Sequence, residues 1–297
     1  MRVALKVDVD TYRGTREGLP RLRRLFARLG IRASFFFTLG PDHTGRRLVR
    51  AFRPEFLRKV RRTSVVANYG VRTLLYGILL PGPVIGRACR DELRTLEEEG
   101  HEVGLHVYDH SLWQDHVRYR DADWTRRQIE KGLIAFRDIW ARNPAGHAAA
   151  GWQINEATLE LEEALGFRYA SDCRGRGGPF HPSWNGRVFR CPQLPTSFPT
   201  LDEVLGRDGV HGDNFPQYFE RLLLDAPEDH VHTLHAELEG GRYLEGFERL
   251  LHLWRAAGAE FETLEERLAR QPSGNLSVRP LVWATIPGRA GQLASVA

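Results

Sequence analysis

Residues 3–10 read VALKVDVD, and this stretch decides the fold class of the chain. It is short and mostly apolar, which is typical of a strand buried on both faces of a parallel sheet. It ends in two carboxylates, Asp8 and Asp10. Because side chains two residues apart in a strand point to the same face, we expect both acids to reach one site where the strand ends.

Helix-like and strand-like segments alternate along the rest of the chain. Residues 15–29 carry leucines at helical spacing and stop at Gly30, and residues 33–39 (ASFFFTL) form a second apolar strand. Further helices are predicted over residues 90–99, 124–140, 155–165 and 247–257, and further strands over residues 102–106, 169–172, 193–196, 231–236 and 260–264. The alternation predicts an α/β fold with a parallel sheet. Polar residues follow several strands, at the end where parallel barrels form their active sites: Asp10, His106, Asp172 and His235.

The bulk composition fits one large globular unit. The chain has 297 residues, of which 42% are hydrophobic, so it can bury a sizeable core in a single domain. No N-terminal signal segment is visible and no run approaches the ~20 apolar residues that span a bilayer, so we expect a cytoplasmic location. The cysteines Cys89, Cys173 and Cys191 show no paired spacing, which argues against a disulfide framework and a cysteine zinc site.

Three elements carry candidate chemistry. His106 and His110 are four residues apart, a spacing that can put two imidazoles on one side of a helical turn around one metal. Taken alone, this pair is as easily explained by surface histidines. Asp8 and Asp10 are costly at the end of a buried strand unless a cation neutralises them, although they could instead cap the next helix. His235 ends a late strand and is either a general acid or a core histidine.

Together these elements describe one reaction. A metal held by one carboxylate and two histidines keeps a position open for water and a substrate carbonyl. The other aspartate removes a proton from the water, and a histidine on the opposite side protonates the departing amine. That is hydrolysis of an amide without a covalent intermediate.

The same residues resemble a known family. The segments VDVDT (residues 7–11), GHEVGLHVYDH (residues 100–110) and HTLHAE (residues 232–237) look like the motifs of the polysaccharide deacetylase family. The resemblance implies a distorted, incomplete (β/α) barrel. It also implies Asp8 as the base, His235 as the acid, and one divalent metal ion on Asp10, His106 and His110. The donor set leaves zinc, manganese, cobalt and iron open.

Further segments resemble one subfamily over nearly the whole chain. They include ASFFFTLGPDHTGR (residues 33–46), YASDCRG (residues 169–175) and IPGRAGQL (residues 286–293). Members of that subfamily remove the formyl group from 4-deoxy-4-formamido-L-arabinose carried by undecaprenyl phosphate. The resemblance therefore implies formate release from this lipid, a step of the lipid A modification that confers polymyxin resistance.

One motif departs from the family pattern. Typical members place an arginine before a proline in the third motif, where it steadies the catalytic aspartate. Here residues 148–152 read AAAGW without arginine, and Arg174 is a candidate substitute. Trp113 and Trp152 lie in motif-bearing segments and are candidates for a wall that excludes acyl groups larger than formyl, although both could equally be core residues.

An insertion at about residues 42–86 interrupts the strand–helix rhythm. Residues 46–62 (RRLVRAFRPEFLRKVRR) combine an apolar stripe with eight basic residues and one acid, Glu55. One reading is a helix packed on the barrel with a solvated basic face. We favour an interfacial segment, over about residues 46–80, that attaches the protein peripherally to the anionic cytoplasmic face of the inner membrane. Nucleic acid could bind the same positive charge, but no nucleic-acid-binding motif accompanies the segment.

Three other functions fit parts of the sequence. A soluble deacetylase of the same family, acting on another amide, would leave the insertion without a use. A glycosyltransferase could hold a metal-bound nucleotide sugar on Asp8 and Asp10, but it gives the histidines no role. A non-catalytic lipid-binding protein leaves both carboxylates unexplained.

Overall fold

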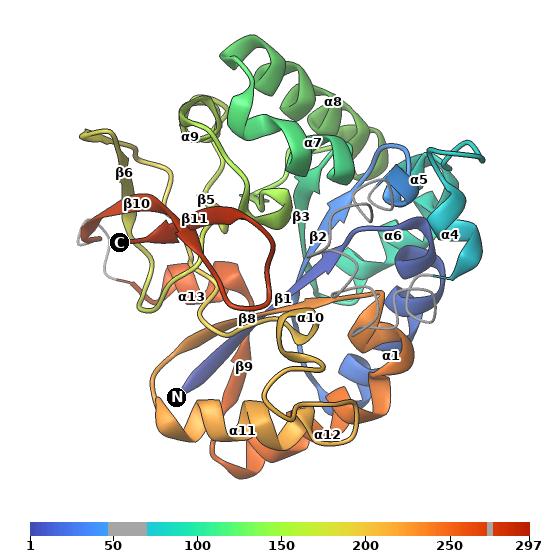
Figure 1. Ribbon diagram of the computed structural model, residues 1–297, viewed down its shortest axis with the longest axis vertical. Helices are drawn as coiled ribbons and strands as arrows, with labels where there is room; N and C mark the ends of the chain where they lie inside the picture. Colours follow the sequence, from blue (N-terminus) through green and yellow to red (C-terminus); the bar gives the residue numbers. More distant parts are fainter. Residues whose placement is uncertain (47–69, 272–275) are drawn as a thin grey trace.

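The computed structural model describes residues 1–46, 70–271 and 276–297. Within these ranges seven parallel strands form the central sheet, in the order β5-β4-β3-β2-β1-β8, with β9 also paired to β1. The strands are β1 (Arg2–Val9), β2 (Ser34–Thr38), β3 (Glu102–Val107), β4 (Gly146–His147), β5 (Tyr169–Ala170), β8 (His230–His235) and β9 (Glu260–Glu262). The sheet curls without closing (Figure 1), so the expected incomplete (β/α) barrel is confirmed.

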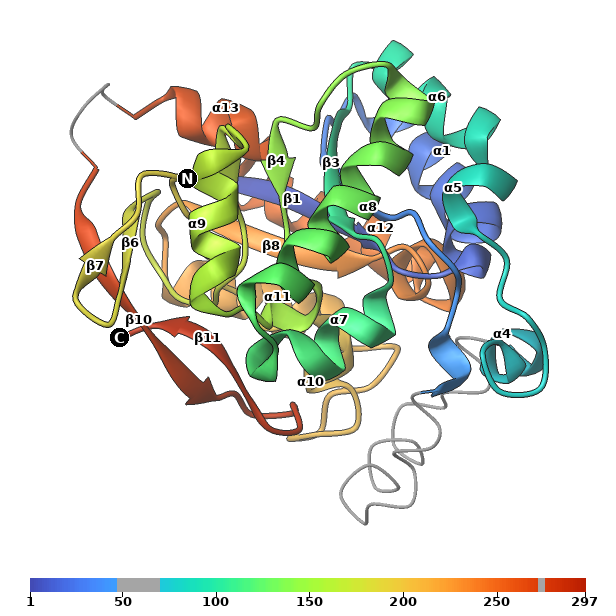
Figure 2. The same ribbon diagram turned by 90° about the horizontal axis from the view of Figure 1, so that it is seen from above.

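Helices pack around this sheet (Figure 1). They are α1 (Leu19–Leu29), α4 (Val71–Leu75), α5 (Ile85–Ala88), α6 (Arg90–Glu98), α7 (His110–His116), α8 (Ala122–Trp140), α9 (Glu156–Ala164), α10 (Leu201–Val204), α11 (Phe215–Asp225), α12 (Leu244–Ala256) and α13 (Leu264–Ala269). A smaller sheet of order β11-β10-β6-β7 lies to one side (Figure 2). Its strands are β6 (His181–Trp184), β7 (Arg187–Val188), β10 (Val278–Thr285) and β11 (Gln292–Val296).

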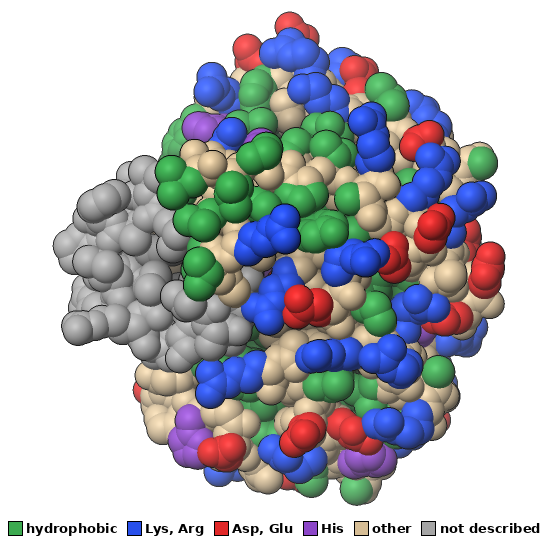
Figure 3. Space-filling model, turned by 90° about the vertical axis from the view of Figure 1, so that its right-hand side faces the viewer, with side chains coloured by type: hydrophobic (Ala, Val, Ile, Leu, Met, Phe, Trp, Pro, Cys, Tyr) green, Lys and Arg blue, Asp and Glu red, His purple; other side chains and the backbone are tan. Residues whose placement is uncertain are grey.

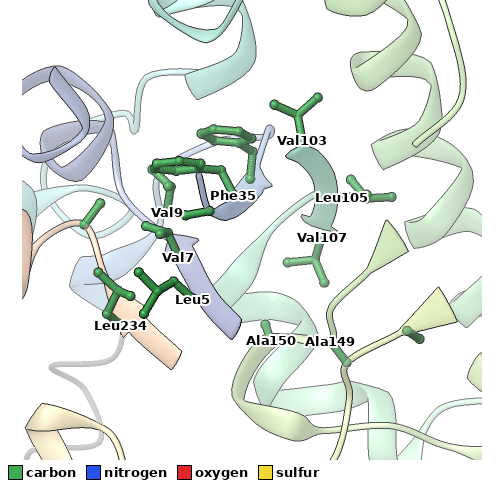
Figure 4. Close-up of a cluster of buried hydrophobic side chains, with 14 of the residues drawn as sticks. Leu5, Val7, Val9, Phe35, Val103, Leu105, Val107, Ala149, Ala150 and Leu234 are labelled. Atoms are coloured by element: carbon green, nitrogen blue, oxygen red, sulfur yellow. The ribbon is translucent and has the colours of Figure 1, made fainter. Parts of the chain in front are cut away.

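Side chains alternate strictly between the two faces of β1. Leu5, Val7 and Val9 join the core cluster that contains the outer helices, where Figure 4 shows them beside Phe35 and Leu234. Ala4 belongs to a separate inner cluster formed by residues of several strands and loops: Phe36, Ala148, Tyr169, Leu194, Val231 and Leu264. The two-residue period of a strand therefore sends the even-numbered residues of β1 into the barrel. These include Lys6 and Asp8.

Most of the expected elements are confirmed, and several were missed. The helix expected from residue 15 begins as a π-helical turn, η1 (Gly14–Gly18), before α1. Residues 193–196 do not form a strand; instead, Gln193 and Thr196 make isolated bridges. The sequence pattern did not predict α11 or the smaller sheet. Most of the expected insertion, including all but Arg46 of the basic segment, lies outside the described residues.

Position 104 in β3 has no room for a side chain, so it requires glycine. A Cβ at this position would lie 2.5 Å from Phe36 Cε1 and 2.9 Å from the carbonyl oxygen of Gly146. We predict that Gly104→Ala lowers the free energy of unfolding by about 1–3 kcal/mol, because an overfilled core must shift to relieve the contact. Gly178→Ala is the matched control, since its Cβ would meet nothing closer than 3.7 Å. Equal unfolding free energies for the two variants in denaturant titrations would contradict this account.

Candidate metal centre

Three residues from separate elements converge at the carboxyl end of the sheet. Asp10 follows β1, His106 lies near the end of β3, and His110 is the first residue of α7. His106 Nε2 lies 3.3 Å from Asp10 Oδ1, and His110 Nε2 lies 3.1 Å from Asp10 Oδ2. One ligand atom from each residue falls within 4.8 Å of the others, and all three side chains are buried. The three residues that the sequence pattern grouped as metal ligands are therefore neighbours in the structure.

The spacing of the two histidines predicted that they share a helical turn, and this prediction is wrong. His106 belongs to a strand and His110 to the following helix, so the chain turns between them. Asp109 holds this turn: its Oδ1 accepts from the backbone N–H of Leu112 and caps α7. Its Oδ2 lies 2.6 Å from His43 Nδ1. The two imidazole rings still meet, with centroids 5.2 Å apart.

This donor set fits a divalent cation. Two imidazole nitrogens and one carboxylate are typical protein ligands for zinc and other transition metals, and three protein ligands leave positions for water and substrate. Nearby, the buried Asp8 Oδ1 has no hydrogen-bond partner within the described ranges. A buried carboxylate oxygen without a donor is costly unless something binds there, such as a water molecule. The donors do not distinguish between the candidate metals.

Glu237 braces the loop that carries Asp10. Its Oε1 accepts from the backbone N–H groups of Asp10 (3.0 Å) and Thr11 (2.7 Å) and from the Thr11 hydroxyl (2.8 Å). Burial and the nearby Asp10 carboxylate raise the pKa of Glu237 to about 8. Sequence reasoning missed this residue, although it stands only two positions after His235.

Asp8 and His235 lie side by side on neighbouring strands. They are register partners in the parallel pair β1–β8, so their side chains leave the sheet on the same face. The backbone N–H of His235 donates to Glu239 Oε2 at 2.9 Å, which ties the end of β8 to the following turn. Burial raises the pKa of Glu239 to about 8.

Lys6 is the cation beside Asp8, and the suggestion of Arg174 is wrong. The fully buried Lys6 Nζ lies 3.4 Å from Asp8 Oδ2 and donates to the carbonyl oxygen of Ser171 at 3.2 Å. Arg174 instead forms a 2.7 Å ion pair with Glu203 and donates to the carbonyl oxygen of Phe198. Lys6 precedes Asp8 by two residues on the same strand face, and this spacing could have revealed it.

The two tryptophans have different surroundings. Trp113 is a core residue: it packs near Trp124 and donates through Nε1 to the carbonyl oxygen of Gln153 at 2.8 Å. Trp152 has a positive φ of 53°, which is rare for a bulky side chain. Three cations surround its ring: Lys6 Nζ at 5.3 Å, Arg289 Cζ at 4.5 Å and Arg174 Cζ at 4.7 Å from the centroid. Trp152 therefore borders the ion pair of Asp8, whereas Trp113 does not.

A second buried cluster has the residue types of a metal site. His147 Nδ1 lies 2.7 Å from Glu162 Oε1 and 3.6 Å from Asp172 Oδ1, and Gln193 donates to both carboxylates. Burial acts to lower the pKa of His147, but Asp172 and Glu162 outweigh it and raise the pKa to about 10. A protonated His147 already supplies the positive charge there. We therefore interpret this cluster as a structural ion pair that also anchors Ala149, whose N–H donates to Asp172.

Comparisons with known proteins agree with this geometry. The sequence profile described as polysaccharide deacetylase matches residues 2–170. Two curated relatives are both named probable 4-deoxy-4-formamido-L-arabinose-phosphoundecaprenol deformylase ArnD. The one from Shewanella sediminis is 39% identical over 90% of this chain and 86% of its own length. The one from Wigglesworthia glossinidia brevipalpis is 32% identical over 95% of this chain and 97% of its own length.

Solved structures agree at the level of the fold. A polysaccharide deacetylase from Mycobacterium smegmatis, described in its name as putative, superposes with a TM-score of 0.65 at 16% identity, covering 96% of this chain and 94% of its own. The Puue allantoinase superposes with a TM-score of 0.64 at 14% identity, covering 90% and 89%. With the matched profile and curated relatives, these findings confirm the family resemblance. This chain belongs to the polysaccharide deacetylase family, and its enzyme class is that of a hydrolase acting on an amide.

Proposed function

We propose that this chain removes the formyl group from 4-deoxy-4-formamido-L-arabinose carried by undecaprenyl phosphate. The products are formate and the free amino sugar lipid used in lipid A modification. The observation that carries the proposal is the convergence of Asp10, His106 and His110 beside the paired positions Asp8 and His235. The names of the two curated relatives, which align along most of this chain, supply the substrate. We propose one catalytic domain over residues 1–297, with the insertion at about residues 42–86.

In the proposed mechanism each residue has one task. Asp10, His106 and His110 would hold the divalent ion, which when bound polarises the amide carbonyl and acidifies water. Asp8 accepts the proton of the attacking water, and Lys6, whose Nζ lies 3.4 Å from Asp8 Oδ2, orients its carboxylate. As the C–N bond breaks, His235 donates a proton to the departing nitrogen. Formate and a protonated amine result.

We also propose that the insertion lies on the anionic cytoplasmic surface of the inner membrane. Its described end exposes a cluster of large apolar side chains: Val71, Ile78, Leu79 and Leu80. Leu79 is 74% exposed, which is unusual for a leucine without a partner surface. Figure 3 shows apolar side chains gathered on this face of the molecule. No helix among the described residues is long and apolar enough to cross a bilayer. We propose a peripheral contact.

Removing one imidazole should remove the metal. We predict that His106→Ala and His110→Ala each bind at least tenfold less divalent metal than the parent and release no measurable formate, because two remaining ligands hold the ion poorly. His211→Ala is the control, since that histidine is 62% exposed. Metal content after dialysis and formate release are the measurements. Full metal content in both variants would refute the ligand assignment.

Lys6 should act through Asp8. We predict that Lys6→Met lowers kcat by about 10–100-fold, a part of the 10²–10⁴-fold that a general base contributes, with KM and metal content little changed. Lys6→Arg should restore part of kcat because it returns a cation beside Asp8. Lys131→Met, on an exposed lysine of α8, is the control. If methionine and arginine at position 6 impair kcat equally, or if KM alone changes, Lys6 does not position the base.

Acyl selectivity distinguishes this proposal from a soluble deacetylase. We predict formate release from the formylated lipid and at least tenfold slower acetate release from its acetyl analogue, because a wall such as Trp152 leaves no room for the extra methyl group. Purified protein with a divalent metal is incubated with each lipid, and both acids are quantified. Equal release of the two acids, or activity restricted to soluble acetylated sugars, would favour the deacetylase instead.

A further inference from the structure

A pocket opens on the surface beside the metal centre and has no part in the mechanism above. It lies between η1 with the start of α1, and the segment that follows β8, which contains η5 (Leu238–Arg242). Its wall includes three arginines, Arg13, Arg21 and Arg242, together with Ala236 and Glu237. Because Ala236 and Glu237 directly follow His235, the pocket adjoins the catalytic end of the barrel.

Glycines create this pocket by letting two turns pack closely. A Cβ on Gly18 would lie 2.0 Å from the carbonyl oxygen of Ala236, and one on Gly240 would lie 2.7 Å from the carbonyl oxygen of Gly18. Gly241 also lines the pocket, and a Cβ there would meet no atom within 4 Å. The wall therefore consists partly of bare backbone, with long arginine side chains around it.

The charge of the pocket is arranged to receive an anion. Glu17 is engaged by Arg13, whose Nε donates to it at 2.9 Å, and Glu237 directs its Oε1 to the loop of Asp10. In the part of the chain that the structure describes, no salt bridge joins Arg21 or Arg242 to a carboxylate. Both side chains are exposed at the rim. Exposed guanidinium groups that form no salt bridge can bind a phosphate oxygen through charge-assisted hydrogen bonds.

Residues that line the pocket contact both the loop of Asp10 and the start of the apolar segment. On one side it adjoins His235 through Ala236. On the other side Arg13 reaches the start of the apolar segment, since a Cβ on Gly70 would lie 2.9 Å from Arg13 Nη1. The substrate of the proposed function has its parts in the same order: formamido sugar, phosphodiester, polyprenyl chain.

We propose that this arginine pocket is the subsite for the phosphodiester of the lipid-linked sugar. The inference rests on the proposed function and deepens it. With the phosphate held by Arg21 and Arg242, the sugar extends toward Asp10 and His235, and the polyprenyl chain leaves over Val71 and Leu79. The pocket thereby distinguishes a lipid-linked sugar from a neutral glycan.

The test compares two soluble substrates that differ in the phosphate. One is the formamido-arabinose ester of a short prenyl phosphate, and the other is the methyl glycoside of the same sugar. For the double variant Arg21→Ala/Arg242→Ala, we predict that kcat/KM falls about 10–100-fold more on the phosphodiester than on the glycoside, since hydrogen bonds to charged groups contribute about 1.5–3 kcal/mol. Arg24→Ala is the control, because this exposed arginine of α1 does not line the pocket. Geranyl phosphate, which lacks the sugar, should bind the parent more tightly than the double variant by a similar factor.

The outcomes separate the subsite from the activity and from the membrane. Equal losses on both substrates, or no loss on either, would overturn the subsite. Binding to anionic phosphatidylglycerol vesicles is measured as well. If the double variant loses only vesicle binding, and its kcat/KM on both soluble substrates is unchanged, the subsite is also overturned and the arginines are assigned to bilayer headgroups. If the parent enzyme releases formate from neither substrate, the proposed function fails, and geranyl phosphate binding still decides whether the pocket takes a phosphate.

Discussion

The alternation of side chains along β1 is the constraint on which the rest of the site depends. Its odd-numbered residues are apolar and bury the outer face against the helices, so register and orientation of the strand are fixed. Lys6 and Asp8 must then point into the barrel, where a lone charge would be strongly destabilising. Their 3.4 Å ion pair makes this burial tolerable. In the proposed mechanism the same cation orients the base, so stability and catalysis would depend on one contact.

The neighbouring loops convert strand ends into a site. The turn after β3 is held by Asp109, which caps α7 and thereby presents His110 toward His106. The loop after β1 is held by Glu237 from the far end of the chain, which fixes the backbone of Asp10. The backbone of Asp10 and the turn before His110 are thus each held by a second polar group, as is typical of metal centres. The buried His106 Nδ1 has no hydrogen-bond partner among the described residues. The membership of the family and this geometry together leave no support for a glycosyltransferase.

The sequence predicted the parts of the molecule that follow from local pattern. Buried strands, amphipathic helices and the convergence of Asp10, His106 and His110 all arise from periodicity and from the rule that parallel strands end together. It could not reveal the partners of these residues. The sequence shows that Arg174 carries a charge suitable for Asp8, but not that Glu203, 29 residues further along, binds it. The smaller sheet was missed because β10 is half exposed and shows no clean alternation. The His147 cluster was invisible because its members meet only through the fold.

The account is tested most directly by locating the metal in the crystallised protein. The described residues hold two groups with the donors for an ion: Asp10 with His106 and His110, and His147 with Glu162 and Asp172. Anomalous diffraction at the absorption edge of the bound metal distinguishes them without reference to activity. We predict one peak at about 2.0–2.2 Å from Asp10 and from both imidazoles of the first group. A peak at His147, or an ion at the first group that contacts neither histidine, would contradict the account.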